Sequence, residues 1–285
     1  MNTFEIVIVR RSLAAAAVAA LFAALVAAGP LAAQQHEHAE GGDHTHAGEP
    51  HFVHPLVAES VSPDTKMRLD YGYLDPGAES ELELEGEYAF HPSVSVELGV
   101  HYDPGAAALG DTHLLLKLVN YAFAERGVLL GSGLSLNLPT GDDGGHAHGG
   151  DPAGGDEVGH THAGLYEFAP FLNAGVMIGD LELVGWTRFR IPTNQSHQED
   201  VETSVGYNIS ALYHLGTRVQ ALLELDGSGG LSGPATARGT SHLTPGVKVR
   251  PFTASSLAIG LGVGIPLTDD RDFDTRTLVS AFYHF

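Results

Sequence analysis

Histidine is concentrated in two short polar stretches of this sequence, and its spacing there is suited to metal binding. Ten of the 17 histidines lie in residues 34–54 or 142–164. They are His36, His38, His44, His46, His51, His54, His146, His148, His160 and His162. Eight of the ten form His-x-His pairs, and in an extended chain residues i and i+2 project to the same side. Two such pairs offer four imidazole nitrogens, which suits Zn²⁺, Cu²⁺ or Ni²⁺.

Two interpretations of these histidines remain open. They form a physiological capture site for divalent metal ions, or they belong to a disordered Gly/Asp/His tract with incidental metal affinity. Interleaved Asp43, Asp142 and Asp143 raise the local cation concentration in either case. Binding should weaken as the pH falls through about 6.5, because protonated imidazole cannot act as a ligand. We expect no required cofactor beyond such ions.

Composition excludes several other kinds of chemistry. The chain has 285 residues and no Cys, so it has no disulfide, thiolate metal site or cysteine nucleophile. It carries 14 Lys and Arg against 35 Asp and Glu, a formal net charge of −21. Nucleic-acid binding needs a basic surface, so we expect no nucleic-acid partner. The acidic balance favours cations instead.

The first 33 residues have the order of a secretory signal peptide. Arg10 and Arg11 precede an apolar run over 13–28, and Gly29, Pro30 and small residues follow up to Ala33. We therefore predict a cleaved leader over 1–33, with an uncleaved membrane helix as the alternative. Residues 34–62 are then expected to form a disordered, histidine-rich tail in the periplasm. Residues 63–285 would form the folded domain, with a His/Gly/Asp-rich loop at 140–164.

Alternation of polar and apolar residues dominates the sequence from Thr65 onward. In 81–88, glutamates at the odd positions alternate with Leu82, Leu84, Gly86 and Tyr88, which predicts a strand with one acidic face and one apolar face. Segments of this kind are predicted near 65–75, 79–90, 94–103, 112–124, 128–139, 165–178, 181–192, 201–215, 217–226, 241–251, 256–267 and 273–285. Strands of about ten residues match the length that crosses a bilayer at a tilt.

The connections between the predicted strands alternate in length. Tight ones, such as 91–93 and 179–180, take turns with longer ones rich in Gly, Asp and Pro, such as 103–111 and 140–164. This alternation is typical of an all-β, up-and-down antiparallel transmembrane barrel, here of about 12 strands. With both termini in the periplasm, the tight turns would be periplasmic and the 140–164 loop extracellular.

The charged face of the predicted strands must enclose the lumen, because lipid cannot accept it. Among the lumen-lining residues we predict Arg68, Glu81, Glu83, Glu85, Glu87, Arg188, Arg190, His214, His242, Lys248 and Arg250. His101 and His113 are predicted to point inward as well. Charges of mixed sign either form cross-strand pairs or bind solutes. Gly260, Gly262 and Gly264 leave an inward strip that a solute or the folded-in tail could occupy.

Short motifs resemble those of known outer-membrane proteins. A last strand ending in Tyr283 and Phe285 resembles the signal read by the barrel assembly machinery, although Ser280 replaces the usual Gly. Segments 136–142, 242–246 and 262–267 are similar to motifs of the meta-pathway phenol-degradation group of outer-membrane transporters. The resemblance covers roughly residues 60 to 285, implies a small-solute transport barrel, and transfers no catalytic residue.

These observations predict an outer-membrane channel or transporter for small solutes, located in a Gram-negative type cell and contacting outer-membrane lipid. Its His-x-His segments would bind divalent transition metals. One alternative is a surface metal-binding barrel with a plugged lumen. An outer-membrane enzyme and a soluble periplasmic β-protein are the others, and we expect no enzymatic activity.

Overall fold

The computed structural model describes residues 50–76, 79–141, 166–193, 203–231, 239–252, 255–269, 271 and 273–285. The predicted leader at 1–33 lies outside these residues, and so do the His-x-His pairs at 36/38, 44/46, 146/148 and 160/162. Their metal binding stays a prediction. Within the described residues, no helix combines the length and the apolar character needed to cross a membrane.

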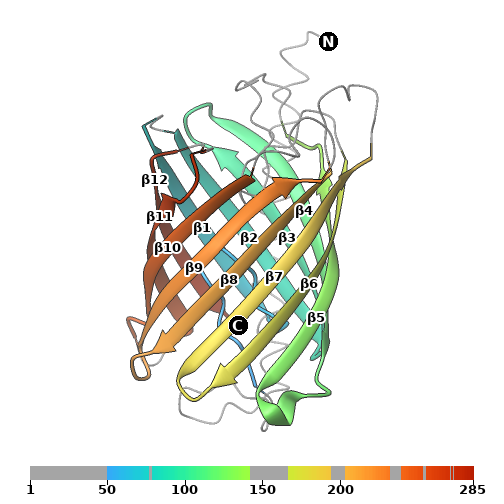
Figure 1. The fold of residues 1–285 in the computed structure, drawn as a ribbon, viewed down its shortest axis with the longest axis vertical. Coiled ribbons are helices and arrows are strands. Elements are labelled where there is room, and N and C mark those ends of the chain that lie inside the picture. The colour runs from blue at the N-terminus through green and yellow to red at the C-terminus, as the bar shows by residue number, and fades with distance from the viewer. Residues whose placement is uncertain are drawn as a thin grey trace. The chain divides into compact units, whose positions relative to one another are not determined.

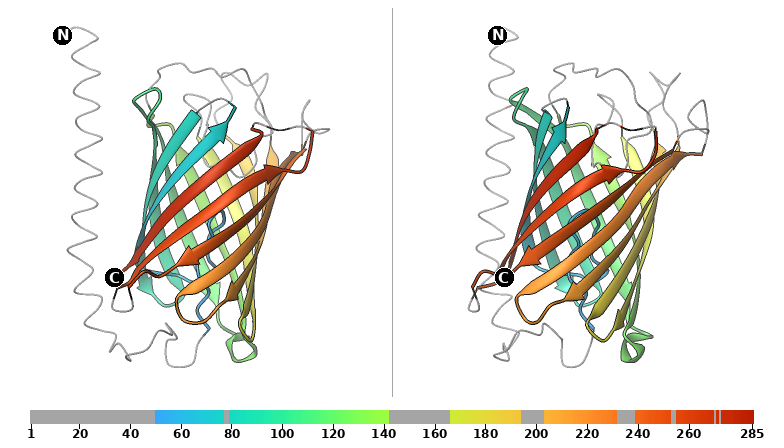
Figure 2. Two further views of the ribbon diagram at one scale, coloured as in Figure 1. Left: turned by 90° about the vertical axis from the view of Figure 1, so that its left-hand side faces the viewer. Right: turned by 60° about the vertical axis from the view of Figure 1, so that its left-hand side comes forward.

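The described residues form twelve strands that close into one antiparallel barrel. The strands are β1 (Lys66–Asp75), β2 (Glu79–His91), β3 (Val94–Asp103), β4 (Ala108–Asn120), β5 (Val128–Leu138), β6 (Glu167–Ile178), β7 (Leu181–Pro192), β8 (Ser204–His214), β9 (Val219–Gly230), β10 (Gly239–Val249), β11 (Leu257–Pro266) and β12 (Thr275–His284). Each strand pairs with its neighbours in sequence, as Figure 1 shows. β1 pairs with β12 and closes the barrel (Figure 2). The predicted up-and-down barrel of about 12 strands is confirmed.

Three predicted boundaries differ from the structure by four residues, and one of them is the end of β4, which lies at Asn120 rather than at 124. β4 begins at Ala108, four residues before the predicted start at 112, so the expected long connection over 103–111 is only the four-residue turn 104–107. β9 continues to Gly230 rather than ending at 226, because Gly227 to Gly230 pair with β8 and β10. Gly227 is buried against the Tyr207 hydroxyl, so a glycine-rich stretch predicted as a loop is part of the barrel wall.

The outer face of the barrel is apolar. On β11, Ile259, Leu261, Val263 and Ile265 are exposed, whereas the residues that alternate with them are buried. A row of large exposed apolar side chains is stable against hydrocarbon and unfavourable in water. Together with the charged inner face, this gives the distribution typical of transmembrane barrels.

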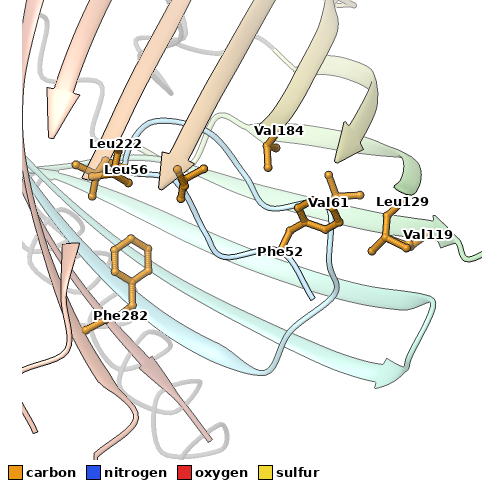
Figure 3. Packing of buried hydrophobic residues seen from close by; sticks show 10 residues of the cluster. Phe52, Leu56, Val61, Val119, Leu129, Val184, Leu222 and Phe282 are labelled. Carbon is orange, nitrogen blue, oxygen red and sulfur yellow. The ribbon is translucent and has the colours of Figure 1, made fainter. Parts of the chain in front are cut away.

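The apolar core lies inside the barrel and includes part of the predicted tail. Phe52, Leu56 and Val61 are buried in one cluster with side chains of seven strand positions, namely Val119, Leu129, Val184, Leu212, Leu222, Ala258 and Phe282. Figure 3 shows the segment that carries the first three residues crossing the interior. The expectation that 34–62 is disordered is therefore wrong for its described part, residues 50–62, because apolar side chains there pack against the inner wall.

Candidate functional site in the barrel lumen

Residues 50–65, which we call the plug, lie inside the barrel toward the end that carries the β8–β9 turn (Figure 1). The plug is held in a compact loop by its own hydrogen bonds. Phe52 N donates to Ser62 Oγ at 2.9 Å, Ser60 Oγ donates to Phe52 O at 2.7 Å, and Ser62 N donates to Ser60 Oγ at 3.1 Å. These bonds join residues 52 and 62 and turn the apolar side chains outward toward the barrel wall.

Carboxylates of the barrel wall bind the plug backbone. Glu224 accepts hydrogen bonds from Leu56 N at 2.7 Å and from Val57 N at 3.2 Å, and its Oε2 also accepts from Ser210 Oγ at 2.9 Å. Glu182 Oε2 accepts from Val53 N at 2.9 Å. Each hydrogen bond to a charged group contributes about 1.5–3 kcal/mol, more than a neutral hydrogen bond does. The wall is thus complementary to the N–H groups of the plug.

Cations of the wall bind the plug carbonyls. Lys248 Nζ donates to His54 O at 2.8 Å, and Arg68 donates to Leu56 O. Lys248 Nζ also lies 3.9 Å from the centre of the Phe282 ring, a cation–π distance. Polar groups of both signs in the wall therefore satisfy the plug backbone.

An ionic cluster connects the plug to β1, β2 and β4. Lys66 Nζ lies 2.9 Å from His54 Nδ1 and 3.4 Å from a carboxylate oxygen of Glu87. Lys117 Nζ lies 3.1 Å from Glu59 and 3.0 Å from Glu87. Both lysine side chains are fully buried. Buried charges are stable only when they are paired, so this cluster depends on Glu59 of the plug as well as on the wall.

The plug's ionisable groups have shifted pKa values. Burial, and then the positive charge of Lys66, lower the pKa of His54 well below its usual value. Burial acts to raise the pKa of Asp64, but His284 and the plug histidines outweigh it and hold that pKa well below the usual range. Burial acts to lower the pKa of His51, but the contact with Asp64 outweighs burial and raises that pKa. Neutral His54 and ionised Asp64 are therefore the forms that favour the docked plug.

A second cluster lies farther along the lumen, on β2, β3 and β4. His101 Nε2 is 3.0 Å and His113 Nδ1 is 3.4 Å from Glu83 Oε1. Glu97 Oε1 is 3.7 Å from the other ring nitrogen of His113. The ligand atoms of Glu83, His101 and His113 all lie within 4.8 Å of one another, which makes them able to hold one metal ion. His54, Glu59 and Glu87 form another group with this spacing.

The structure places the predicted lumen residues as follows. Arg68, Glu85, Glu87, Arg188, His242 and Lys248 are buried, whereas Glu81, Glu83, Arg190 and His214 are partly buried. His242 contacts Asp226 at 3.1 Å and stacks on Phe273, and His214 contacts Glu182. Arg250 follows the last residue of β10. Of the predicted metal ligands, only His51 and His54 are described, and both lie in the plug, with His51 3.4 Å from Asp64.

The sequence left the folded-in tail as one of two occupants of the glycine strip, but it did not indicate which wall residues would bind the tail. The role of Glu182 and Glu224 in binding the plug depends on contacts more than 100 residues apart. The plug itself has a signal in the sequence, since Phe52, Val53, Leu56, Val57 and Val61 interrupt an otherwise polar tail. Apolar residues at that density indicate a segment that is buried rather than solvated.

Comparisons with known proteins identify the fold and no family. No family model matches the chain, and no curated protein matches it. Among solved structures, the KdgM porin aligns with 13% identity and a TM-score of 0.51, covering 77% of this chain and 99% of that one. The COG4313 outer membrane channel from Pseudomonas putida F1 gives 14% identity and a TM-score of 0.56, covering 82% and 100%. The NanC porin gives 8% identity and a TM-score of 0.54, covering 77% and 98%. The chain is therefore similar in fold to outer-membrane barrels that carry the names porin and channel.

Proposed function

We propose that this protein is an outer-membrane barrel of a Gram-negative type cell and acts as a channel for small solutes that the plug closes. The observation that carries the proposal is a closed barrel with an apolar outer face and an inner face of charged residues. An interior of this kind solvates polar solutes, whereas the outer face is compatible with lipid alone. The structural neighbours named as a porin and as an outer membrane channel support the same function.

The way the plug is bound suits a reversible closure. Its backbone is held by separate polar contacts to Glu182, Glu224 and Lys248. Leu56 packs over Gly260 and Gly262, where the wall has no side chains of its own. This is the glycine strip for which the sequence left a solute or the folded-in tail as occupants. Release of the plug would expose these groups to a passing solute without changing the barrel.

We propose that the His-x-His pairs of the tail and of the 140–164 loop bind divalent transition metals, with Zn²⁺, Cu²⁺ and Ni²⁺ as candidates. For the two other histidines of the tail, His51 and His54, we propose that they hold the plug, since His51 lies 3.4 Å from Asp64. At His54, Lys66 Nζ lies 2.9 Å from Nδ1, so an ammonium group already occupies the position of a metal ion at that ring nitrogen. The assignment to the phenol-degradation transporter group and the periplasmic location of the tail are also part of the proposal.

A barrel that serves only as a plugged membrane anchor is the second candidate, and the buried plug favours it. Conductance in planar bilayers separates the two. We expect a variant lacking 50–62 to show larger or more frequent current steps than the full chain. A variant lacking 34–46 keeps the plug and is the matched control, with steps like those of the full chain. If deletion of 50–62 leaves the bilayer silent, the channel proposal is wrong and the anchor remains.

A further inference from the structure

Three side chains from adjacent strands converge on one point inside the barrel. Glu83 on β2 is directly opposite His101 on β3, and Gly99 on β3 is opposite His113 on β4. The β3–β4 register shifts between Val100 and Tyr102, so His101 sits at a β-bulge. Bulges redirect side chains and are frequent beside functional sites. His101 and His113 thereby come to flank the same oxygen of Glu83.

Within the described residues, the two ring nitrogens lie within 3.4 Å of Glu83 Oε1 as ion pairs, but the three converging atoms form no well-aligned hydrogen bond. Glu83 Oε1, His101 Nε2 and His113 Nδ1 are all buried. The His113 side chain is 7% exposed. A buried polar atom without a well-formed hydrogen bond is costly, and three such atoms facing one another point to a ligand that all of them share. Their chemistry, two imidazoles and a carboxylate, is that of a metal site.

The distances fit a small transition-metal ion. In a tetrahedral zinc shell the bonds are about 2.0–2.1 Å, which places neighbouring donor atoms about 3.3 Å apart. Glu83 Oε1 lies 3.0 Å from His101 Nε2 and 3.4 Å from His113 Nδ1. Two histidines and one glutamate also leave a position for water or a solute, as in sites with three protein ligands.

Neighbouring groups support one of the histidines as a ligand. Glu97 Oε1 lies 3.7 Å from His113 Nε2, the nitrogen that faces away from Glu83. A carboxylate on the distal nitrogen sets the tautomer and the ring orientation of a metal-binding histidine. Gly99 makes room for the ring, because a Cβ at that position would overlap His113 Cε1. Glu97 thus orients the His113 ring, and Gly99 leaves space for it.

The local charge favours a cation here and not at the neighbouring candidate. Among the described residues of the plug, β1, β2, β3 and β4, the ion pairs in this part of the lumen include six carboxylates but three lysine or arginine side chains, namely Glu59, Asp70, Glu83, Glu85, Glu87 and Glu97 against Lys66, Arg68 and Lys117. In the group of His54, Glu59 and Glu87, Lys66 already supplies the positive charge. Among the described residues, by contrast, Glu83 has the two histidines within 4.0 Å, whereas Arg68 is paired more closely with Asp70 and Glu85.

We propose that Glu83, His101 and His113 form a binding site for one divalent transition-metal ion inside the lumen, with Glu97 as the residue that orients His113. The site is separate from the His-x-His pairs, and it does not depend on whether the barrel conducts. The fourth coordination position of the ion would be open to water or to a solute in the lumen.

The test uses the full chain in detergent with the eight histidines of the His-x-His pairs changed to Asn, so that only the lumen can bind tightly. Titration with Co²⁺ is followed by visible absorption, and Zn²⁺ is then added as a competitor. We expect one Co²⁺ per chain, with absorption bands of low-coordinate cobalt that Zn²⁺ abolishes. Failure to bind one equivalent of Co²⁺ would overturn the proposal.

Variants then locate the ion. His101→Gln and His113→Gln should each weaken Co²⁺ binding at least 100-fold, and Glu97→Gln by roughly 10–100-fold. His242→Gln is the matched control, because it removes a lumen histidine beside a single carboxylate and should leave binding unchanged. Gly99→Ala keeps every ligand but displaces His113, so it should weaken binding even if a ligand variant fails to fold. Equal binding by the parent and by folded His101→Gln or Gly99→Ala chains would overturn the proposal.

Discussion

Glu224→Gln should release the plug from the barrel wall. The carboxylate accepts Leu56 N at 2.7 Å, Val57 N at 3.2 Å and Ala58 N at 3.4 Å. A glutamine keeps one acceptor oxygen, but its NH₂ group would face plug N–H groups, donor against donor. The loss of at least one charge-assisted hydrogen bond costs about 2 kcal/mol, within the usual range of about 1.5–3 kcal/mol. The undocked population should therefore rise about 30-fold.

Cysteine labelling measures this population directly, because the chain contains no Cys. Ala58→Cys places a thiol on the plug at a position that is 5% exposed, where a charged, membrane-impermeant thiol reagent reaches it only after undocking. When docking is faster than labelling, the labelling rate is proportional to the undocked population. We expect the rate in Ala58→Cys to rise about 30-fold when Glu224→Gln is added.

Glu125→Gln is the control for this experiment. Glu125 is an exposed glutamate in the short 3₁₀-helix η1 (Ala124–Arg126), so the same chemical change there should not alter labelling. Equal rates for the Glu224→Gln and Glu125→Gln chains would show that the carboxylate does not hold the plug. A rise in both would indicate a general loosening of the barrel instead.

Three further outcomes are expected. Gly260→Ala should increase Ala58→Cys labelling, because its Cβ would overlap the side chain of the plug leucine. In a His51→Gln chain, labelling of Ala58→Cys should also rise as the pH falls below about 6.5. The pKa of His54 is lower in the docked plug than in the undocked plug, so protonation of His54 in acid favours the undocked plug. Leu172→Arg, at an exposed position in the middle of β6, should lower the free energy of unfolding in lipid by about 2–4 kcal/mol. Ile178→Arg, at the end of the same strand, should lower it by about 1 kcal/mol or less. Urea titrations measure both.

The barrel was predictable because most of its strands follow one simple rule. Lipid outside and polar groups inside impose a period of two, so the alternation of Glu81 to Glu87 with leucines is visible without any structure. The rule fails where side chains are small. Gly227, Gly229 and Gly230 have no apolar pattern, and the extension of β9 through them is set by pairing with β8 and β10.

The candidate site was less predictable than the barrel. That Glu83, His101 and His113 point inward follows from their positions in alternating segments. Their convergence depends on the strand register and on the bulge at His101, neither of which the period of two determines. The docking of the plug likewise depends on wall residues, such as Glu224, that are distant in sequence, so composition alone favoured a disordered tail.

Glu97 links the plug to the proposed metal site. One oxygen of its carboxylate lies 3.4 Å from Lys66 Nζ and the other lies 3.7 Å from His113 Nε2. When the plug leaves, Lys66 loses its contacts with Glu59 and His54. Its ammonium group then interacts more strongly with Glu97. The interaction of Glu97 with the His113 ring is weakened as a result. Metal binding should therefore be weaker in a chain lacking 50–62, and by reciprocity the ion should slow Ala58→Cys labelling by the same factor. Equal Co²⁺ affinity with and without the plug would show that Glu97 transmits nothing between the two.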